Sequence, residues 1–329
     1  MGLNIIGAGM YVPETVATND DFAKIVDTSD EWITTRTGIK TRHINNGELT
    51  FQMGAKAADL AVKDAGIDMS QIDMVLATTV TSDFLTPSLA CMVAKEIGIE
   101  DAACMDLNAA CSGYVFALDV AKKYLDSGDF HTILIVSAEI VTRMVDYTDR
   151  GTCVLFGDGA AATVVTKGEG IYAAALRSSP QGALKIFTKL PEPENPFKTQ
   201  GSDWGDERVQ QAAPYQMQML GHDVYKFATV AMADAVEQAA QKAGISVEDL
   251  KLIIPHQANI RIVQTAIKRL KLPVERFYVN IEKYGNISSA CIPLALAELK
   301  AQGRLEKGDK ICVVGFGAGL TYGAAVFEY

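Results

Sequence analysis

The stretch 110-ACSGYVFALDVAKKYLDSGDFHTILIV-136 decides the fold, because it aligns without gaps on 290-ACIPLALAELKAQGRLEKGDKICVVGF-316 at an offset of 180. A second block, 65-AGIDMSQIDMVLATT-79, aligns on 243-AGISVEDLKLIIPHQ-257 at an offset of 178. Each copy has the pattern of a helix, a turn and a buried strand. Two blocks in the same order at nearly the same offset indicate a duplicated α/β unit.

The duplication predicts two halves, residues 1–170 and 215–329, each alternating strands with helices as in mainly parallel α/β architecture. Residues 171–214 are predicted to form an excursion or cap between them. Its part from 178 to 214 is rich in Pro, Gln, Gly and charged residues and has no sustained period. Long loops in compact domains tend to be functional, so we expect a lid or the wall of an entrance there.

Composition places the chain among soluble globular proteins, with 49% hydrophobic and 21% charged residues over 329 residues. A net charge of -10 opposes general nucleic-acid binding. The start, MGLNIIGAGMYVPE, lacks a basic n-region and a cleavage site, and the apolar stretch 311–327 is interrupted by glycines. We therefore expect a cytoplasmic protein without a membrane span. The six cysteines lack CxxC spacing, so no metal site is predicted.

Cys111 is the candidate nucleophile. It stands directly before GYVFALDVAKKYL, whose apolar spacing predicts a helix, and a helix N-terminus favours the thiolate that attacks thioesters. Small neighbours on both sides permit a tight turn. A buried structural cysteine is the alternative, and this is the role we expect for Cys291 in the second copy.

Two polar residues of the second half are candidate partners of Cys111. His256 ends the apolar strand of KLIIPHQAN, at the place that Thr78 holds in the first half, where parallel α/β sheets bind ligands. Asn286, in KYGNISSACIP, precedes the helix that duplicates the Cys111 helix, and its amide can donate a hydrogen bond without titrating. A surface histidine and a plain turn or N-cap asparagine are the respective alternatives.

The glycine-rich stretch 315-GFGAGLTYG-323 lacks the third glycine of a dinucleotide fingerprint, and no acidic partner follows a strand. We interpret it as a strand-to-strand loop whose amides approach a reacting thioester, as an oxyanion hole requires.

Six motifs together resemble β-ketoacyl-acyl-carrier-protein synthase III, nearly from end to end. They are TSDEWITTRTGIKTRHI (28–44), NAACSGY (108–114), DRGTCVLFGDGAAA (149–162), PHQAN (255–259), YGNISSA (284–290) and GFGAGLTYG (315–323). The resemblance implies a five-layered αβαβα thiolase fold and a homodimer. It also implies initiation of fatty-acid synthesis from an acyl-CoA primer and malonyl carrier protein, with no metal or redox cofactor.

By the pattern of this family, Cys111 accepts the acyl group and releases CoA, while the amides of Cys111 and Ala318 hold the thioester oxyanion. His256 and Asn286 then stabilise the enolate formed as the malonyl group loses carbon dioxide. Two hydrogen-bond donors that are fixed next to the oxygen on which negative charge develops lower the barrier to this decarboxylation.

The resemblance also implies the substrate contacts. For CoA these are Trp32 and Arg150 around the adenine, Thr28 and Arg36 nearby, and Asn259 along the pantetheine arm. Trp32 as a core residue is the alternative. The acidic carrier protein is expected to bind a patch of basic residues. Alternatively, these residues form only a solvent-exposed helix face without a partner. We place this patch at Arg261, Lys268, Arg269 and Lys271.

The chain departs from the pattern of the family at Thr86, where many relatives carry a phenylalanine that reaches the acyl pocket of the partner. A smaller residue leaves room for primers longer than acetyl. The excursion between residues 178 and 214 is also longer than usual in the family.

Several other classes of protein share part of this pattern. The order Cys, His, Asn occurs in papain-like hydrolases, but their C-G-S-C-W context is absent and the duplicated α/β halves do not fit that architecture. Among thiolase-fold enzymes, a degradative thiolase needs a second catalytic cysteine and a hydroxymethylglutaryl-CoA synthase needs a glutamate. A starter ketosynthase of a natural-product pathway stays open. A non-enzymatic carrier-protein scaffold would more simply lack one of the three residues.

Overall fold

Nine of the strands form two mixed sheets in the computed structural model, which describes residues 2–329, and the other four form two short two-stranded sheets. The first sheet has the order β1-β7-β6-β4-β5 and the second β11-β12-β13-β8. The strands of the first sheet are β1 (Gly2–Tyr11), β4 (Met74–Thr78), β5 (Ala103–Leu107), β6 (Thr132–Ile140) and β7 (Asp158–Gly168). Those of the second are β8 (Tyr172–Ser178), β11 (Leu252–Pro255), β12 (Lys310–Gly317) and β13 (Thr321–Glu328).

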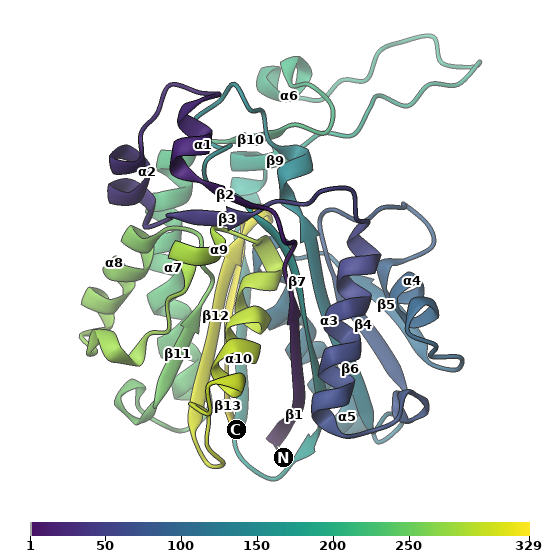
Figure 1. Cartoon of the computed structure of the whole chain (residues 1–329), viewed down its shortest axis with the longest axis vertical. Coiled ribbons are helices and arrows are strands. Elements are labelled where there is room, and N and C mark those ends of the chain that lie inside the picture. The colour runs from purple at the N-terminus through teal and green to yellow at the C-terminus, as the bar shows by residue number, and fades with distance from the viewer. Residues whose placement is uncertain (1) are drawn as a thin grey trace.

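Six helices complete five layers (Figure 1). They are α3 (Thr50–Ala65), α4 (Leu89–Glu96), α5 (Gly113–Ser127), α7 (Gly221–Lys242), α8 (Ile260–Leu270) and α10 (Cys291–Ala301). One apolar cluster packs α3 and α4 on the outer face of the first sheet, and another packs α7 and α8 on the outer face of the second. The largest cluster holds α5 and α10 between the two sheets. The five-layered thiolase-like fold is thus confirmed.

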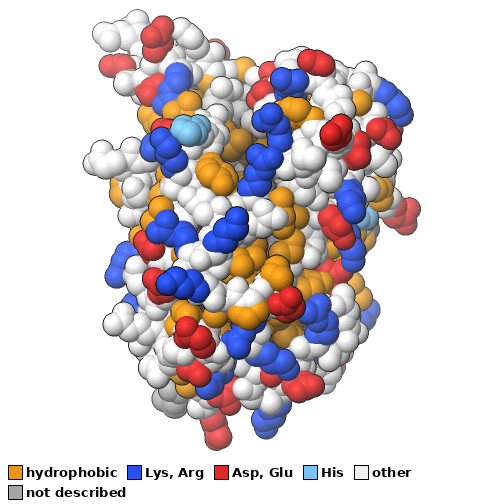
Figure 2. Space-filling view, turned by 90° about the vertical axis from the view of Figure 1, so that its left-hand side faces the viewer, with side chains coloured by type: hydrophobic (Ala, Val, Ile, Leu, Met, Phe, Trp, Pro, Cys, Tyr) orange, Lys and Arg blue, Asp and Glu red, His pale blue; other side chains and the backbone are white. Residues whose placement is uncertain are grey.

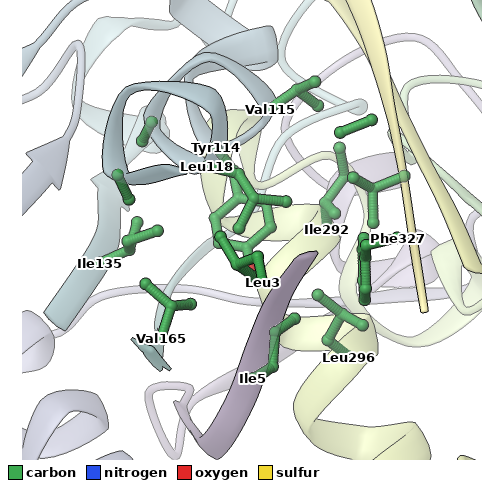
Figure 3. Packing of buried hydrophobic residues seen from close by; sticks show 14 of the residues in the cluster. Leu3, Ile5, Tyr114, Val115, Leu118, Ile135, Val165, Ile292, Leu296 and Phe327 are labelled. Atoms are coloured by element: carbon green, nitrogen blue, oxygen red, sulfur yellow. The ribbon is translucent and has the colours of Figure 1, made fainter. Parts of the chain in front are cut away.

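Alternation along the strands assigns side chains to these layers. In β4, Met74 and Leu76 face the central helices while Val75 and Ala77 face α3 and α4. Successive side chains of a strand point to opposite faces of the sheet. Because both faces of β4 are buried, both sets of side chains are apolar, and the strand is a continuous apolar run in the sequence. Figure 3 shows the central layer, where Tyr114, Val115 and Leu118 of α5 lie with Ile292 and Leu296 of α10 among residues of both sheets.

The repeated Ala-Gly-Ile triplet marks the end of the long outer helix in each half. Gly66 and Gly244 have φ of +66° and +71°, the left-handed conformation that ends a helix and that glycine adopts without steric cost. A 3₁₀ turn and the first parallel strand of each sheet follow, namely β4 and β11. The predicted helix, turn and strand are confirmed in both copies.

The two halves match at an offset of 178 in the core, and this corrects the sequence alignment at 180. Met74 pairs with Ile133 in the first sheet, and Leu252 pairs with Ile311 in the second, both 178 positions later. The turns before α5 and α10 match at the same offset, because Ala110 (φ +47°) corresponds to Ser288 (φ +48°). The counterpart of Cys111 is therefore Ser289 and not Cys291.

The pairing of strands refines the prediction in two respects. The sheets are mixed as expected, but β7 pairs antiparallel with β1 and β6, and β13 pairs antiparallel with β8 and β12, so parallel pairs do not dominate. In addition, β8 falls in the segment 171–214 that was predicted to be a cap, yet it is a full member of the second sheet. We propose that the second half begins at β8.

The remaining elements gather at one end of the molecule, opposite the two chain termini (Figure 1). They are β2 (Val16–Thr18), α1 (Asn19–Ala23), α2 (Asp30–Thr37), β3 (Thr41–His43), β9 (Ile186–Thr188), α6 (Glu207–Gln211), β10 (Met217–Met219) and α9 (Ile281–Tyr284). β9 and β10 pair with each other, and the chain between them extends outward as a long exposed loop carrying α6.

Replacing Leu118 with alanine tests the central layer. Leu118 is fully buried between the sheets, so its truncation leaves a cavity and should lower the free energy of unfolding by about 2–5 kcal/mol. Leu60→Ala is the matched control, because Leu60 is 46% exposed on α3 and its loss should cost less than about 1 kcal/mol. Urea denaturation at one protein concentration measures both. Equal losses would contradict the layer assignment.

Candidate active site

Cys111 lies in the 3₁₀ turn Ala110–Ser112, directly before α5, and is half-buried. Hydrogen bonds hold this turn. The Asn108 side-chain oxygen accepts from the N–H of Ala110 at 3.3 Å, and the Ser112 hydroxyl donates to Ala109 O at 2.7 Å. Ser112 Oγ also lies 2.8 Å from Thr321 Oγ1 on β13. The turn is thereby attached to the second half of the molecule.

The end of β12 packs directly against this turn. A Cβ atom placed on Gly317 would lie 2.6 Å from the backbone nitrogen of Cys111, and one on Gly315 would lie 3.1 Å from Ser112 Cα. Any side chain at Gly317 would therefore displace Cys111. The chain then continues into the turn Ala318–Leu320, which is held to Ser179 by two backbone hydrogen bonds. Ala318, predicted to supply an oxyanion-hole amide, immediately follows the glycine that touches Cys111.

Several groups act on the Cys111 thiol. Burial raises the pKa of Cys111 to about 11, the nearby Ser288 hydroxyl lowers it, and the Glu139 carboxyl raises it. Burial and Glu139 thus oppose the favourable effect of the helix N-terminus that the sequence predicts. A thioester that binds here must therefore meet a group that is protonated at neutral pH until attack begins.

His256 follows β11 and is buried, with 1% of its surface exposed. Its backbone N–H donates to Val314 O at 2.8 Å, which places it beside the glycine-rich end of β12. The ring meets Phe316 edge to face at 5.3 Å, and Nδ1 has no hydrogen-bond partner among residues 2–329. Burial lowers the pKa of His256 to about 3, so the imidazole is neutral at physiological pH.

Asn286 is buried in the segment between α9 and the 3₁₀ turn Ser288–Ala290. Its side-chain oxygen accepts from the N–H of Ser288 at 2.9 Å, which orients the amide and leaves Nδ2 to donate elsewhere. Asn286 N donates to Leu155 O at 2.9 Å, and its carbonyl accepts from Gly157 N, so the backbone is fixed from both sides.

Cys291 is buried, as expected for a core cysteine.

The structure brings the three predicted catalytic residues to one place. The turn of Cys111 packs against the end of β12, which runs beside His256, and it also contacts the turn 288–290 that follows Asn286. A half-buried thiol thus lies among two neutral polar side chains and the glycine-rich backbone. Such a site can take up an acyl group and stabilise negative charge on an adjacent oxygen without a cation.

The predicted CoA residues Trp32, Arg36 and Arg150 also cluster. The guanidinium carbons of Arg36 and Arg150 lie 4.8 and 5.1 Å from the centroid of the Trp32 ring. Arg150 also donates to Asp27 O at 2.7 Å. A base between Trp32 and Arg150 needs about 7 Å, twice a contact distance of about 3.5 Å. Arg150 must therefore swing outward before an adenine can enter.

Two further predicted CoA contacts have different environments. The Thr28 hydroxyl is buried and has no hydrogen-bond partner among residues 2–329. Asn259 caps α8, its side-chain oxygen accepting from the N–H of Arg261 at 2.9 Å. This bond leaves the Nδ2 of Asn259 free for a ligand, whereas its oxygen is already engaged.

The four basic residues of the predicted patch are exposed, and none of them is ion-paired within the part of the chain described, namely Arg261, Lys268, Arg269 and Lys271. Arg261 donates to Thr35 O at the end of α2, so it also connects two helices. Figure 2 shows Lys and Arg side chains spread over the face that carries α2 and α8, among hydrophobic and acidic ones. Thr86 lies apart from this patch, on an exposed loop beside Leu85, which is 92% exposed.

Sequence reasoning missed two residues. Asn108 is the counterpart of Asn286 at the offset of 178, and each side-chain oxygen accepts from the N–H two positions later. Glu139 is fully buried near Cys111, although a carboxylate within the apolar run ILIVSAEIV is itself a signal. Aligning the two turns on their asparagines would have revealed both.

Within residues 2–329 the structure has neither a metal-ligand cluster nor a candidate membrane span. No group of three or more His, Cys, Asp or Glu side chains is placed to hold a metal ion. Over the same residues, none of the helices combines the length and the hydropathy needed to cross a bilayer. The expectation that no cofactor is required stays a prediction.

A cysteine carried by one duplicated half, working beside polar groups of the other in a five-layered fold, distinguishes the condensing enzymes of the thiolase class. The sequence profile of 3-oxoacyl-[acyl-carrier-protein (ACP)] synthase III matches residues 105–180, and that of its C-terminal part matches 240–329. The chain is 45% identical over 331 residues to the β-ketoacyl-[acyl-carrier-protein] synthase III of Clostridium acetobutylicum, covering 99% of this chain and 98% of that protein.

Solved structures agree with the sequence comparison. The 3-oxoacyl-[acyl-carrier-protein] synthase III of Aquifex aeolicus VF5 is 38% identical, with a TM-score of 0.90 and full coverage of both chains. The priming β-ketosynthase of the R1128 polyketide biosynthetic pathway is 33% identical, with a TM-score of 0.89 and 99% and 96% coverage. The chain belongs to the β-ketoacyl-[acyl-carrier-protein] synthase III family of acyltransferases, which carry out the initiating condensation of fatty-acid synthesis.

Replacing Gly317 with alanine tests the close approach of β12 to the Cys111 turn. Because the new Cβ would lie 2.6 Å from Cys111 N, the nucleophile must move, and acylation of Cys111 should fall by roughly 10²-fold. Gly221→Ala is the control, since a Cβ there meets nothing within 4 Å. Both variants are followed by intact-mass spectrometry after incubation with acyl-CoA. Wild-type acylation in Gly317→Ala would refute the packing constraint.

The burial of His256 predicts a neutral imidazole throughout the physiological range. Because its pKa is lowered to about 3, the NMR signals of its ring should not titrate between pH 5 and 8. The unfolded chain binds this proton near pH 6.5 and the folded chain does not, so His256 should also lower stability progressively as pH falls below about 6.5. A midpoint near 6.5 would contradict the neutral form.

Proposed function

We propose that the enzyme transfers an acyl group from acyl-CoA to Cys111 and then condenses it with malonyl-[acyl-carrier protein]. The product is a 3-ketoacyl-[acyl-carrier protein]. The observation that carries this proposal is the position of the Cys111 turn, between the glycine-rich end of β12 and two buried neutral donors. No charged base is needed for the second step, because loss of carbon dioxide generates the nucleophile directly.

In the first step, Cys111 Sγ attacks the thioester carbonyl and CoA leaves as its thiol, taking up the proton that the cysteine loses. The amides of Cys111 and Ala318 hold the oxyanion, which forms only as the carbonyl becomes tetrahedral. Gly317 supports this role, because the absence of a side chain lets the following backbone lie next to the turn. We assign CoA to the surface formed by Trp32, Arg36 and Arg150, with Thr28 and Asn259 along the way.

In the second step, the malonyl group loses carbon dioxide and its electron pair moves onto the thioester oxygen. His256 and Asn286 donate to this oxygen. Both donors are neutral: His256 because burial lowers its pKa, and Asn286 because an amide does not titrate. The enolate carbon then attacks the acyl-Cys111 carbonyl, and the Cys111 thiolate leaves.

We further propose a homodimer formed along the β5 edge of the first sheet. β5 is the last strand of that sheet, and the loop between β4 and α4 exposes Phe84 at 43% and Leu85 at 92%. An uncovered strand edge next to exposed apolar side chains is a common site of association. Thr86 belongs to this loop, so its small side chain would leave room for longer primers at such an interface. The basic patch on α8 and at Lys271 directly after it is the proposed docking surface for the acidic carrier protein.

The similarity to a priming ketosynthase of polyketide synthesis supports a second candidate, a starter enzyme that uses a different carrier protein. The chemistry at Cys111 is the same in both. The two candidates differ in which malonyl carrier protein is accepted, and in the primer that Cys111 prefers.

The two half-reactions provide the test of the proposed function. Wild type should form acyl adducts with acyl-CoAs, including chains longer than acetyl, while Cys111→Ser should form none by intact-mass spectrometry. Asn286→Ala and His256→Ala should still acylate, but release of carbon dioxide from malonyl carrier protein should fall by roughly 10²-fold or more. Loss of acylation in the latter pair, or adducts on Cys111→Ser, would refute the division of roles.

A further inference from the structure

The duplicated turns before α5 and α10 differ in one respect that concerns the site. In the first, the strand end of the opposite half is Gly317, which leaves room for Cys111. At the offset of 178 the residue that corresponds to Gly317 is Glu139 on β6, and the residue that corresponds to Cys111 is Ser289. The Ser289 hydroxyl donates to Glu139 Oε1 at 2.7 Å. The pseudo-symmetric second site is therefore filled by a carboxylate.

Glu139 is fully buried, and its hydrogen-bond partners are neutral donors. Its Oε2 accepts from Thr79 Oγ1 at 3.2 Å, from Val80 N at 3.0 Å and from Thr81 Oγ1 at 2.8 Å, all in the segment that follows β4. Together with Ser289 these donors form a polar network in the centre of the molecule. Such a network fixes the backbone segments that supply the donors, because an unpaired partner would be costly.

The network reaches the catalytic residues through one short turn. Ser289 is the second residue of the turn 288–290, and its N-terminal neighbour Ser288 donates its N–H to Asn286 Oδ1. The Ser288 hydroxyl is buried and faces both the Cys111 thiol and the Glu139 carboxylate, without a well-aligned bond to either. Displacement of Ser289 would thus move the Asn286 amide and the group next to Cys111 together.

We propose that Glu139 is a positioning residue: by holding Ser289 it fixes the turn that orients Asn286 against Cys111. This rests on the proposed roles of Cys111 and Asn286. Glu139 also acts on the nucleophile through charge. Burial raises the pKa of the Glu139 carboxyl, while hydrogen bonds from Val80, Ser289 and Thr81 lower it. The titratable groups that interact with it here are the thiols of Cys111 and of Cys291 on α10, and the Glu139 carboxylate opposes ionisation of both.

Two variants test the proposal, with alkylation of Cys111 by iodoacetamide as a readout independent of the condensation. Glu139→Gln removes the charge, so the midpoint of the alkylation rate should move to a lower pH by roughly 0.5 to 1. Ser289→Ala keeps the charge and removes one bond, so the alkylation midpoint should stay while malonyl decarboxylation falls about tenfold. Acylation by acyl-CoA should persist in Ser289→Ala.

Asp73→Asn is the matched control. Asp73 accepts from the N–H groups of His131 and Thr132, at the other end of the same sheet, so the variant removes a carboxylate without touching the site. It should change neither readout. The proposal would be overturned by two results together. These are an alkylation midpoint in folded Glu139→Gln equal to that of wild type, and a rate of malonyl decarboxylation in Ser289→Ala equal to that of wild type. If Glu139→Gln does not fold, the result for Ser289→Ala alone decides. Failure of the proposed function itself would appear separately, as acyl adducts on Cys111→Ser.

Discussion

The packing of two buried helices, α5 and α10, between the sheets is the constraint on which the rest of the structure depends. Each helix begins at a turn that meets the strand end of the opposite half: β12 against the turn of Cys111, and β6 against that of Ser289. Apolar side chains of both sheets surround the helices, so their axes cannot shift without opening the largest core cluster. The positions of Cys111 and Asn286 are thus consequences of core packing and not of loop conformation.

The same constraint explains how a duplicated fold supports a single site. Two turns of nearly equal geometry meet two equivalent strand ends, and the difference lies in what the strand end carries. Gly317 has no side chain, so the backbone of β12 can pack directly against Cys111, whereas the side chain of Glu139 lies beside Ser289 and accepts its hydroxyl hydrogen bond. This hydrogen-bonded carboxylate stabilises the turn that carries Asn286.

Much of this architecture could be predicted from the sequence, because burial on both faces imposes continuous apolar strands and because the duplication repeats them. The register could not. The alignment at 180 matched Gly128 and Asp129 with Gly308 and Asp309, which lie in loops of different length after α5 and α10. Apolar helices tolerate a shift of two without an obvious break in pattern. The turns themselves carry the correct register, through Asn108 and Asn286.

For the site, the sequence predicted which residues approach one another but not their surroundings. The Cys111 turn, the strand carrying His256 and the segment of Asn286 are fixed by the fold that the motifs imply. The contact between Trp32 and Arg150 depends on side-chain positions. In β8 four of the seven residues are partly buried and two are exposed, and this edge strand has no regular alternation of apolar and polar residues in the sequence. Neither feature leaves a periodic signal in the chain.

In the proposed reaction, the neutrality of His256 and Asn286 meets the requirement that one site serve two steps. A cation at the position of His256 would hold the malonyl carboxylate and disfavour its departure as carbon dioxide, whereas a neutral donor interacts most strongly with the enolate oxygen that forms afterwards. Burial keeps His256 uncharged, and the Asn286 amide is uncharged at any pH. The glycine-rich backbone adds donors that are likewise neutral. The neutral donors therefore stabilise the enolate oxygen, where negative charge develops, more than the malonyl carboxylate, where charge is already present. This difference lowers the barrier to decarboxylation and does not merely tighten substrate binding.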